Sequence, residues 1–283
     1  MNLTRATLCA LLKYPWTREP SGHKANKWGA YTAEQGIMEW AREACSLERD
    51  AQSVEAALMD WADDVAYAVH DLGDFFRAGL IPFDRLVTDM AERERFLTSQ
   101  LERHVRAEAD RFDVDDLQRA FNRLVDYAAI SAPYRGSRLD QAGIYGFTSK
   151  LIDRYISAVS LRETASSRSP LAIEQEAEME VTMLKGLTWH YVIENRALTT
   201  QRFGQRALIT SLFETFCQAA ASRDDWHVFP AAYREALFQG NDDATVLRTV
   251  ADLISSMSEQ QVVEVHQRLT GHSLGSAMDP ILP

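Results

Sequence analysis

Three side chains that could bind a metal ion and a hydroxylated ligand recur at four-residue steps within the segment MDWADDVAYAVHDLGDFF. They are Asp63, Tyr67 and Asp71. If the segment is helical, residues four apart lie on neighbouring turns of one face, about 6 Å apart along the axis. One carboxylate of such a face could hold a hard divalent cation, while the phenol and the second carboxylate bind ligand hydroxyls.

The same face also permits a simpler interpretation. It carries three further aspartates: Asp60, Asp64 and Asp74. None of the five aspartates has a lysine or arginine four residues later to neutralise it. A solvated acidic face opposite an apolar stripe would have this composition, and the spacing alone favours it over a metal site.

The segment ahead of this face, KYPWTREPSGHKANKWGAY, concentrates positive charge and aromatic rings. Against a single acid, Glu19, stand four cations: Lys13, Arg18, Lys24 and Lys27. Four aromatic residues are interleaved with them: Tyr14, Trp16, Trp28 and Tyr31. Lysine is a common partner of phosphate, although an exposed loop with its aromatic rings packed on the core is the simpler alternative. A basic aromatic loop beside an acidic face is the combination that a nucleoside triphosphate and its metal require.

Hydrophobic periodicity predicts helices almost everywhere. Apolar residues recur at steps of three and four through residues 53–79, and again through 184–191 and 208–216. Thr32 with Gln35, and Ser258 with Gln261, have the spacing of capping boxes. No segment shows the alternation of a half-buried strand, so we predict an all-α fold.

Proline, glycine and serine divide the predicted helices. They predict a long loop over residues 14–31, a break at 131–137 (SAPYRGS) and a linker at 164–170 (TASSRSP). We therefore predict a helical core over residues 1–163 and a C-terminal helical region over residues 164–283 that packs on it.

Composition limits the partners of the chain. Its 283 residues carry a formal net charge of −11, so we expect no general nucleic-acid binding, and an anionic ligand requires a local basic patch or a metal. No apolar run approaches the roughly 18 residues of a membrane span, and the first residues lack the features of a signal peptide. Three separated cysteines, Cys9, Cys45 and Cys217, predict buried thiols and a cytoplasmic location.

Other catalytic motifs are weak. The histidines form no HxxxH or HExxH pair, and His190 is predicted to pack between helices. The sequence has no Walker loop, GxGxxG or GxSxG. Asp63 and Asp64 are followed by Val65, Ala66 and Tyr67, so the DDxxD motif of prenyl-diphosphate enzymes is not met.

The residues described above lie in blocks that resemble a known family. Three stretches are similar to consecutive blocks of the dGTPase-type HD triphosphohydrolases: MNLTRATLCALLKYPW, KWGAYTAEQGIMEWARE and ALMDWADDVAYAVHDLGDFFRAGLIP. Three later stretches are similar to that family's C-terminal helices: LKGLTWHYVI, FGQRALITSLFETF and VADLISSMSEQQVVEVHQRLTG. The resemblance implies a partial HD-domain-like helical bundle that hydrolyses a dNTP, with dGTP preferred, to deoxynucleoside and inorganic triphosphate.

The resemblance also implies roles for single residues. In that family an H…HD…D quartet holds a divalent metal of the Mg²⁺ or Mn²⁺ class, and its last Asp matches Asp63, which is thereby the candidate catalytic residue and metal ligand. Tyr67 and Asp71 match residues that contact the deoxyribose. Family positions that are expected to face the triphosphate match Lys13, Tyr14 and Lys27. A nucleotide-contacting arginine of the family matches Arg248.

The chain departs from the family pattern at one point. The family's first His and its His-Asp dyad should precede the LTRATL block, where this sequence has only Met1 and Asn2. We therefore expect a fragment of a longer enzyme that is inactive alone, because one Asp cannot hold a catalytic metal. The leading hypothesis is a homo-oligomeric dNTP triphosphohydrolase. The alternative is a catalytically incomplete helical protein that binds nucleotide or assembles with a partner subunit.

Overall fold

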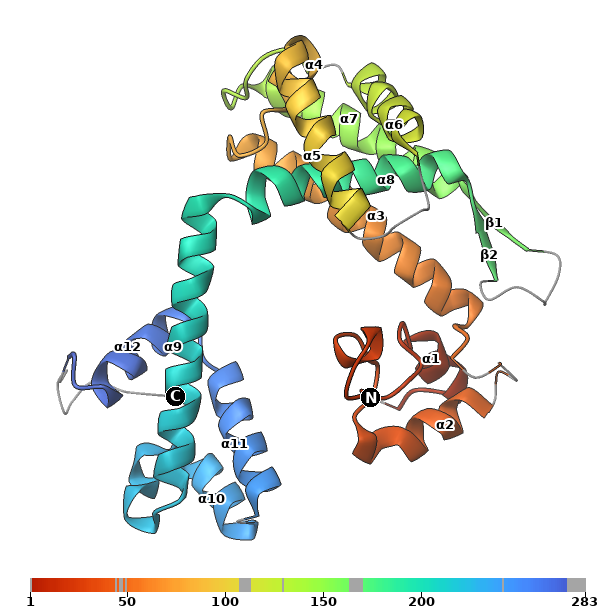
Figure 1. Ribbon diagram of the computed structural model, residues 1–283. Coiled ribbons are helices and arrows are strands. Elements are labelled where there is room, and N and C mark those ends of the chain that lie inside the picture. Colours follow the sequence, from red (N-terminus) through yellow and green to blue (C-terminus); the bar gives the residue numbers. More distant parts are fainter. Residues whose placement is uncertain are drawn as a thin grey trace. The chain divides into compact units, whose positions relative to one another are not determined.

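The computed structural model describes residues 2–43, 45, 48, 50–106, 113–128, 130–162, 170–240 and 242–273. The chain divides into two units, Met1–Asn195 and Arg196–Pro283, and both are built almost wholly of helices (Figure 1). The predicted all-α class is confirmed.

The N-terminal part of the first unit places the basic loop between two short helices. Helix α1 (Arg5–Ala10) begins at Thr4, whose hydroxyl accepts from the Thr7 amide, and α2 (Gln35–Glu43) follows the loop. Residues 14–31 form the predicted loop, with one 3-10 turn at His23–Ala25. The capping box predicted at Thr32 and Gln35 is wrong, because the Glu34 carboxylate instead accepts from the Tyr31 amide at 3.0 Å.

Helix α3 (Val54–Arg77) is the predicted acidic helix, and it begins at Ser53, whose hydroxyl accepts from the Ala56 amide. Its apolar stripe is buried from Trp61 onward, whereas the first two members, Val54 and Leu58, are 40% and 48% exposed. The stripe therefore faces the core only beyond the first turn and a half.

Five more helices complete the first unit: α4 (Phe83–Thr88), α5 (Met90–Arg106), α6 (Val114–Tyr127), α7 (Arg138–Ser157) and α8 (Gln175–Thr188). Helix α8 lies against α3 and α6, and α7 also packs on α3. Because α8 is buried on most sides, it is the central helix of this layer. The predicted break at residues 131–137 is confirmed as a non-helical connection.

Two short antiparallel strands were not predicted: β1 (Val159–Leu161) and β2 (Leu171–Ile173). Three residues each are too few to show alternation, so the pattern could not reveal them. The predicted linker lies almost wholly outside the described residues, since 163–169 are not described. The division between units falls at residues 195 and 196, beyond the predicted boundary at 163 and 164, because α8 packs on α3 and α6 and so joins the first unit.

A π-helical turn, Trp189–Ile193, follows α8. Within it His190 lies against Phe96 and Tyr191, and its Nδ1 is 2.8 Å from the Ser99 hydroxyl. His190 therefore packs between helices, as predicted.

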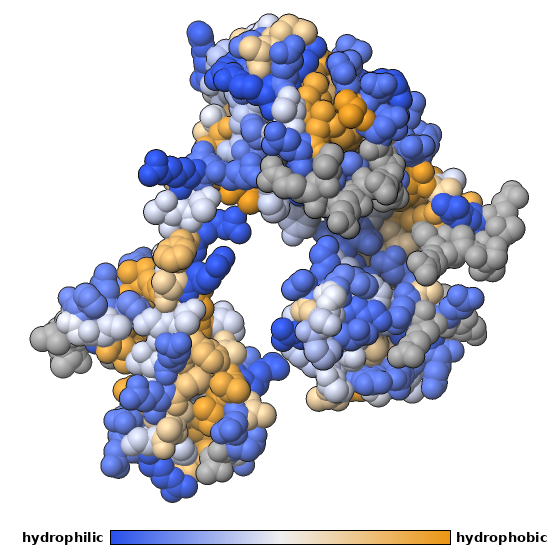
Figure 2. Space-filling model, viewed as in Figure 1, coloured by the Kyte–Doolittle hydropathy of each residue, from blue (hydrophilic) through white to orange (hydrophobic). Residues whose placement is uncertain are grey.

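The second unit comprises α9 (Arg196–Ala220), the 3-10 turn Arg223–Val228, α10 (Ala231–Gln239), α11 (Asp243–Ser255) and α12 (Glu259–Leu269). Its core includes Leu212, Phe216, Trp226 and Leu253. The capping box at Ser258 and Gln261 is confirmed by bonds in both directions. In Figure 2 apolar side chains also gather on the visible surface of this unit, along α9 and α11.

Within the described residues, no helix is both long and apolar enough to cross a membrane. Of the three cysteines, Cys9 is buried as predicted, whereas Cys45 and Cys217 are only half-buried. Burial and the neighbouring Cys45 thiol raise the pKa of Cys9 to about 11, which keeps this thiol protonated.

Candidate functional site

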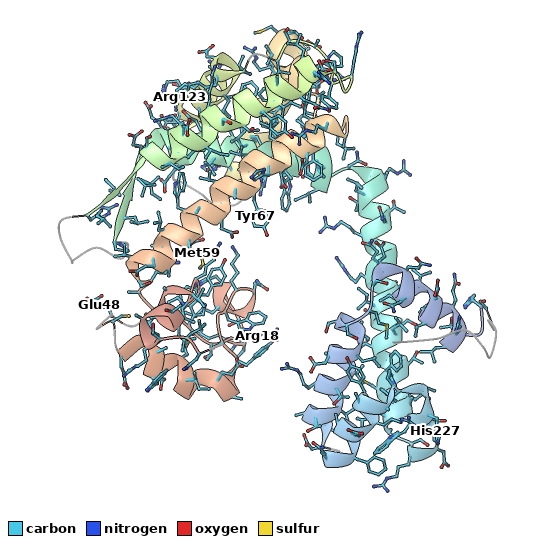
Figure 3. The ribbon with its side chains drawn as sticks, turned by 180° about the vertical axis from the view of Figure 1, so that it is seen from behind. Arg18, Glu48, Met59, Tyr67, Arg123 and His227 are labelled. Carbon is cyan, nitrogen blue, oxygen red and sulfur yellow. The ribbon has the colours of Figure 1, made fainter. Side chains whose placement is uncertain are left out.

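Asp63, Tyr67 and Asp71 lie on three successive turns of one uninterrupted helix, as their spacing predicted. The rotation of α3 is fixed from its opposite side, where the Trp61 indole N–H donates to the carbonyl of Tyr155 at 3.2 Å. Tyr67 extends outward from α3 and is 62% exposed (Figure 3). The three polar side chains are therefore presented together on the surface of the first unit.

Asp63 does not face solvent alone, because the loop provides a partner fifty residues away. The Lys13 ammonium donates to Oδ2 of Asp63 at 2.7 Å and lies 2.8 Å from Oδ1 of Asp60. Partial burial alone would lower the pKa of Lys13, but its hydrogen bonds to both aspartates outweigh burial and raise it. Two predicted site residues, Lys13 and Asp63, are thus brought into direct contact.

Gln52 fixes the main chain beneath this contact. Its side-chain amide donates to the carbonyl of Lys13 at 2.8 Å and to Oδ2 of Asp60 at 3.2 Å. Because Gln52 immediately precedes α3, it ties the end of α1 and its loop to the start of the acidic helix.

The remaining aspartates differ in how they are neutralised. Lys185 of α8 lies 2.5 Å from Asp64, and Arg77 lies 2.7 Å from Asp74. The expectation of an unneutralised acidic face is therefore wrong. The cations that pair with these aspartates come from distant segments or, for Asp74, from a residue three positions later in the same helix. A search for cations four residues after each aspartate could not find them.

Asp71 is the exception among these aspartates. In the part of the chain that the structure describes, its carboxylate makes no ion pair, and the Tyr67 hydroxyl makes no hydrogen bond. Burial, with a smaller contribution from Asp74, raises the pKa of Asp71, while His70 opposes the shift. Tyr67 and Asp71 thus present polar groups that remain available to a ligand.

Two of the four cations of the loop lie near one aromatic ring. The Nζ atoms of Lys13 and Lys27 lie 5.8 Å and 5.6 Å from the centre of the Tyr14 ring, within cation–π range. Lys27 has no acidic partner among the described residues. Three residues that the resemblance places at the triphosphate are therefore side by side.

The main chain holds this arrangement closely. The Gly29 amide donates to the Trp16 carbonyl at 3.1 Å, and the Trp16 indole donates to the Lys27 carbonyl at 2.8 Å. A methyl group at position 29 would overlap the carbonyl oxygen of Tyr14. Only glycine permits this approach between the KYP and KWG segments.

The other two loop cations are engaged elsewhere. Lys24 lies 2.8 Å from Asp50 and 3.3 Å from Glu19, and Arg18 lies 5.0 Å from the centre of the Trp28 ring. Lys24 is thus neutralised, and Lys13 is the loop cation that is paired with the acidic helix.

The described residues do not by themselves form a metal centre. Among them no group of three or more His, Cys, Asp or Glu side chains is placed to hold a metal ion. Asp63 can supply one carboxylate, and its oxygen already accepts from Lys13. A metal ligand role for Asp63 stays a prediction that needs further ligands from outside the described residues.

Arg248, the seventh predicted site residue, lies in α11 of the second unit. Its guanidinium Nε lies 2.9 Å from both carboxylate oxygens of Asp252, one turn along the same helix. The position of the second unit relative to the site is not determined, so contact of Arg248 with a nucleotide also stays a prediction.

Sequence reasoning missed two partners of the acidic face, Gln52 and Lys185. Neither lies in a motif: Gln52 precedes the helix whose Asp60 it contacts, and Lys185 reaches Asp64 from a distant helix. Asp60 was recognised as part of the face, but its bond to Lys13 was not foreseen.

The C-terminal part of the chain matches a known family. Residues 171–268, which include β2, α8 and most of the second unit, match the family described as phosphohydrolase-associated domain. The match covers less than half of the chain and concerns its C-terminal part alone.

Relatives extend the similarity across the chain. A protein of Streptomyces coelicolor A3(2) named deoxyguanosinetriphosphate triphosphohydrolase-like is 33% identical over 282 residues, covering 96% of this chain and 64% of the relative. Proteins of the same name from Corynebacterium efficiens and Bifidobacterium longum are 32% and 26% identical, covering 96% and 95% of this chain. The chain is a homologue of these triphosphohydrolase-like proteins, which confirms the resemblance. It spans 64% of the length of the first two and 58% of the third.

Proposed function

We propose that the chain serves the hydrolysis of a deoxynucleoside triphosphate, with dGTP preferred, to deoxynucleoside and inorganic triphosphate. The names of the relatives support the reaction class and the preference. The observation that carries the proposal is the contact of Lys13 with Asp63. This contact supports the proposal because Lys13, a phosphate-binding candidate, lies beside Asp63, the metal-binding candidate of α3. Tyr67 and Asp71 lie further along the same helix.

The residues divide the work by their chemistry. Lys13 and Lys27, whose ammonium groups both lie near the Tyr14 ring, would stabilise negative charge on the triphosphate. Tyr67 and Asp71 would bind hydroxyl groups of the deoxyribose. A divalent ion of the Mg²⁺ or Mn²⁺ class would supply Lewis acidity and a more acidic bound water. Asp63 would be one of its ligands, and the others would come from outside the described residues.

A second candidate is a catalytically incomplete protein that binds nucleotide or assembles with a partner subunit. The lack of a complete metal centre among the described residues favours it. Assembly, including homo-oligomers, is supported by exposed apolar side chains in both units. In the first unit these include Leu11 at 56% and Leu58 at 48%, and in the second Phe203 at 72% and Ile209 at 49%. Where such side chains form one contiguous patch, exposed apolar surface commonly marks association.

The two candidates differ in one assay, the release of inorganic triphosphate from dGTP with Mn²⁺ or Mg²⁺. We expect none from the 283-residue chain, and metal-dependent release from a longer version that carries the H…HD segment ahead of the LTRATL block. Asp63→Ala in the longer version should abolish release, whereas Asp74→Ala, which removes a carboxylate paired with Arg77, should retain it. Full release by the Asp63→Ala variant would refute the metal role. A longer version that binds dGTP but never releases triphosphate would favour the second candidate.

A further inference from the structure

The second unit contains a cleft that the proposed function does not use. Its volume is about 500 Å³, which lies within the range of small-molecule sites. Phe216, Phe229 and Val265 line it and are at most 2% exposed, so the cleft reaches the core of the unit. Every residue that lines it belongs to the second unit, and the cleft is therefore defined by this unit alone.

The side chains that line this cleft are apolar or basic. Besides the three core residues they are Val228, Pro230, Leu269, His227 and Arg268. Among the described residues that line it there is no acid, although the chain has a formal net charge of −11. The same residues offer no side-chain oxygen that could accept from a hydroxyl or amino group of a ligand. The lining thus favours an apolar ligand body with a negative group at one end.

His227 contributes a hydrogen-bond donor to this lining. The guanidinium of Arg234 lies 3.2 Å from Nδ1 of His227. A guanidinium can only donate, so Nδ1 is the acceptor and the proton of the neutral ring is on Nε2. His227 is an exposed residue of the second unit (Figure 3), and its Nε2–H is available to a ligand.

The start of α10 adds a further preference for negative charge. Pro230 lines the cleft and immediately precedes this helix. No side chain caps the helix, and its first turn contains no acid. Because the amides of a helix N-terminus carry partial positive charge, they favour an anion beside them. The cationic Arg268, the His227 donor and this helix N-terminus therefore favour the same kind of ligand.

We propose that the cleft binds a small organic carboxylate with an apolar body, of the aryl or alkyl class. The apolar body packs on Phe216, Phe229 and Val265, and Arg268 pairs with the carboxylate, for which a guanidinium has matching geometry. A nucleotide fits less well, because its hydroxyl and amino groups would find no side-chain acceptor in the lining. The site involves none of the residues of the candidate site in the first unit.

Binding of 2-naphthoate to the 283-residue chain, measured by isothermal titration calorimetry, tests the charge preference. The neutral analogue 2-naphthylmethanol should bind at least about tenfold more weakly, because it lacks the group that pairs with Arg268. Arg268→Gln should weaken the binding of 2-naphthoate by about tenfold for the same reason. Arg206→Gln is the matched control, since it removes an exposed arginine of α9 that does not line the cleft. Its affinity should change less than about twofold.

A second pair of variants tests the location. Val228 lines the cleft and is 39% exposed, so Val228→Trp should fill the cleft and abolish binding. Val263 of α12 is 37% exposed and does not line the cleft, so Val263→Trp should bind 2-naphthoate like the parent.

A measurement on the parent chain needs no variant. Nuclear Overhauser effects should connect the naphthalene protons with the Phe229 ring and the Val265 methyl groups. Absence of binding, equal affinities for 2-naphthoate and 2-naphthylmethanol, or contacts only with residues outside the cleft would overturn the inference. Neither dGTP nor a metal enters these experiments, so their outcome is independent of the proposed function.

Discussion

Carboxylates occupy two kinds of environment in the first unit. On α3, Asp60, Asp63 and Asp64 are 37–44% exposed and are paired with lysines. In the layer beneath, Glu180 of α8 is fully buried and Glu92 of α5 is 6% exposed, and both are paired with arginines. The exposed carboxylates are thus paired with compact, flexible ammonium groups, and the buried carboxylates with planar guanidinium groups.

The difference separates exchangeable from permanent ion pairs. Arg123 donates to Glu180 at 2.7 Å while Arg154 lies 3.5 Å away, and the Glu180 charge has no route to solvent. Arginine is the less hydrated cation and suits a buried pair, whereas lysine is strongly hydrated and exchanges partners readily. We infer that the buried pairs maintain the layer of α5–α8 and that the surface pairs are the ones a ligand can replace.

Removing the most buried carboxylate should have the largest effect. Glu180→Ala should lower the free energy of unfolding by about 3–5 kcal/mol, because it leaves two arginines without their buried partner. Glu176→Ala, on the same helix and 61% exposed, is the control and should stay within about 1 kcal/mol. Urea unfolding followed by circular dichroism would measure both, and similar losses for the two variants would contradict the comparison.

A smaller loss of stability is expected when Glu92 loses only its hydrogen bond from Tyr191, because its ion pairs with arginines remain. The Tyr191 hydroxyl donates to Glu92 at 2.8 Å, so Tyr191→Phe should lower the free energy of unfolding by about 1.5–3 kcal/mol, the contribution of a hydrogen bond to a charged group.

Tyr191 also gives this prediction a pH signature. Burial and Glu92 raise the pKa of Tyr191 in the folded state above the ordinary value of 10.0. Above about pH 10 the unfolded phenol ionises first, so this contribution to stability is lost as pH rises further. Tyr191→Phe should flatten the fall in unfolding free energy above pH 10. If the unfolding free energy of Tyr191→Phe fell with pH as steeply as that of the parent, the Tyr191 hydroxyl would not be buried against Glu92.

The smallest effect belongs to a surface pair. Lys185 and Asp64 are 42% and 44% exposed, so Lys185→Gln should change the free energy of unfolding by no more than about 1 kcal/mol, and less in high salt. Thermal melts at low and high NaCl would measure it. A loss as large as that of Glu180→Ala would place this pair with the permanent ones.

Periodicity was sufficient to predict α3 and the face that carries three of the predicted site residues. The apolar stripe predicted α3 and thereby set Asp63, Tyr67 and Asp71 on one face, and proline and glycine predicted the loop that carries Lys13 and Lys27. Burial of Glu180 also had a signal, since it shares its helix face with Ala177 and Leu184, although its charge argued against it.

The pairing of these elements was not predictable from the same signals. Lys13 and Asp63 are fifty residues apart, and Lys185 reaches Asp64 from across more than a hundred. Such contacts depend on how α1, α3 and α8 pack, and no local pattern records the packing of one helix on another. The strands β1 and β2 were not predicted for a different reason: each is too short to show a periodic pattern.

The close approach of Gly29 to Tyr14 bears on the entropy of binding. Ordering a mobile side chain at an interface costs roughly 0.5–1.5 kcal/mol, and ordering a loop adds to this. Here the Gly29 and Trp16 hydrogen bonds, together with the bridge between Thr17 and Ala30, order the backbone during folding. Capture of an anion, as proposed for this loop, would therefore begin from a preorganised frame, and of the two lysines only Lys27 would still have to lose its side-chain freedom.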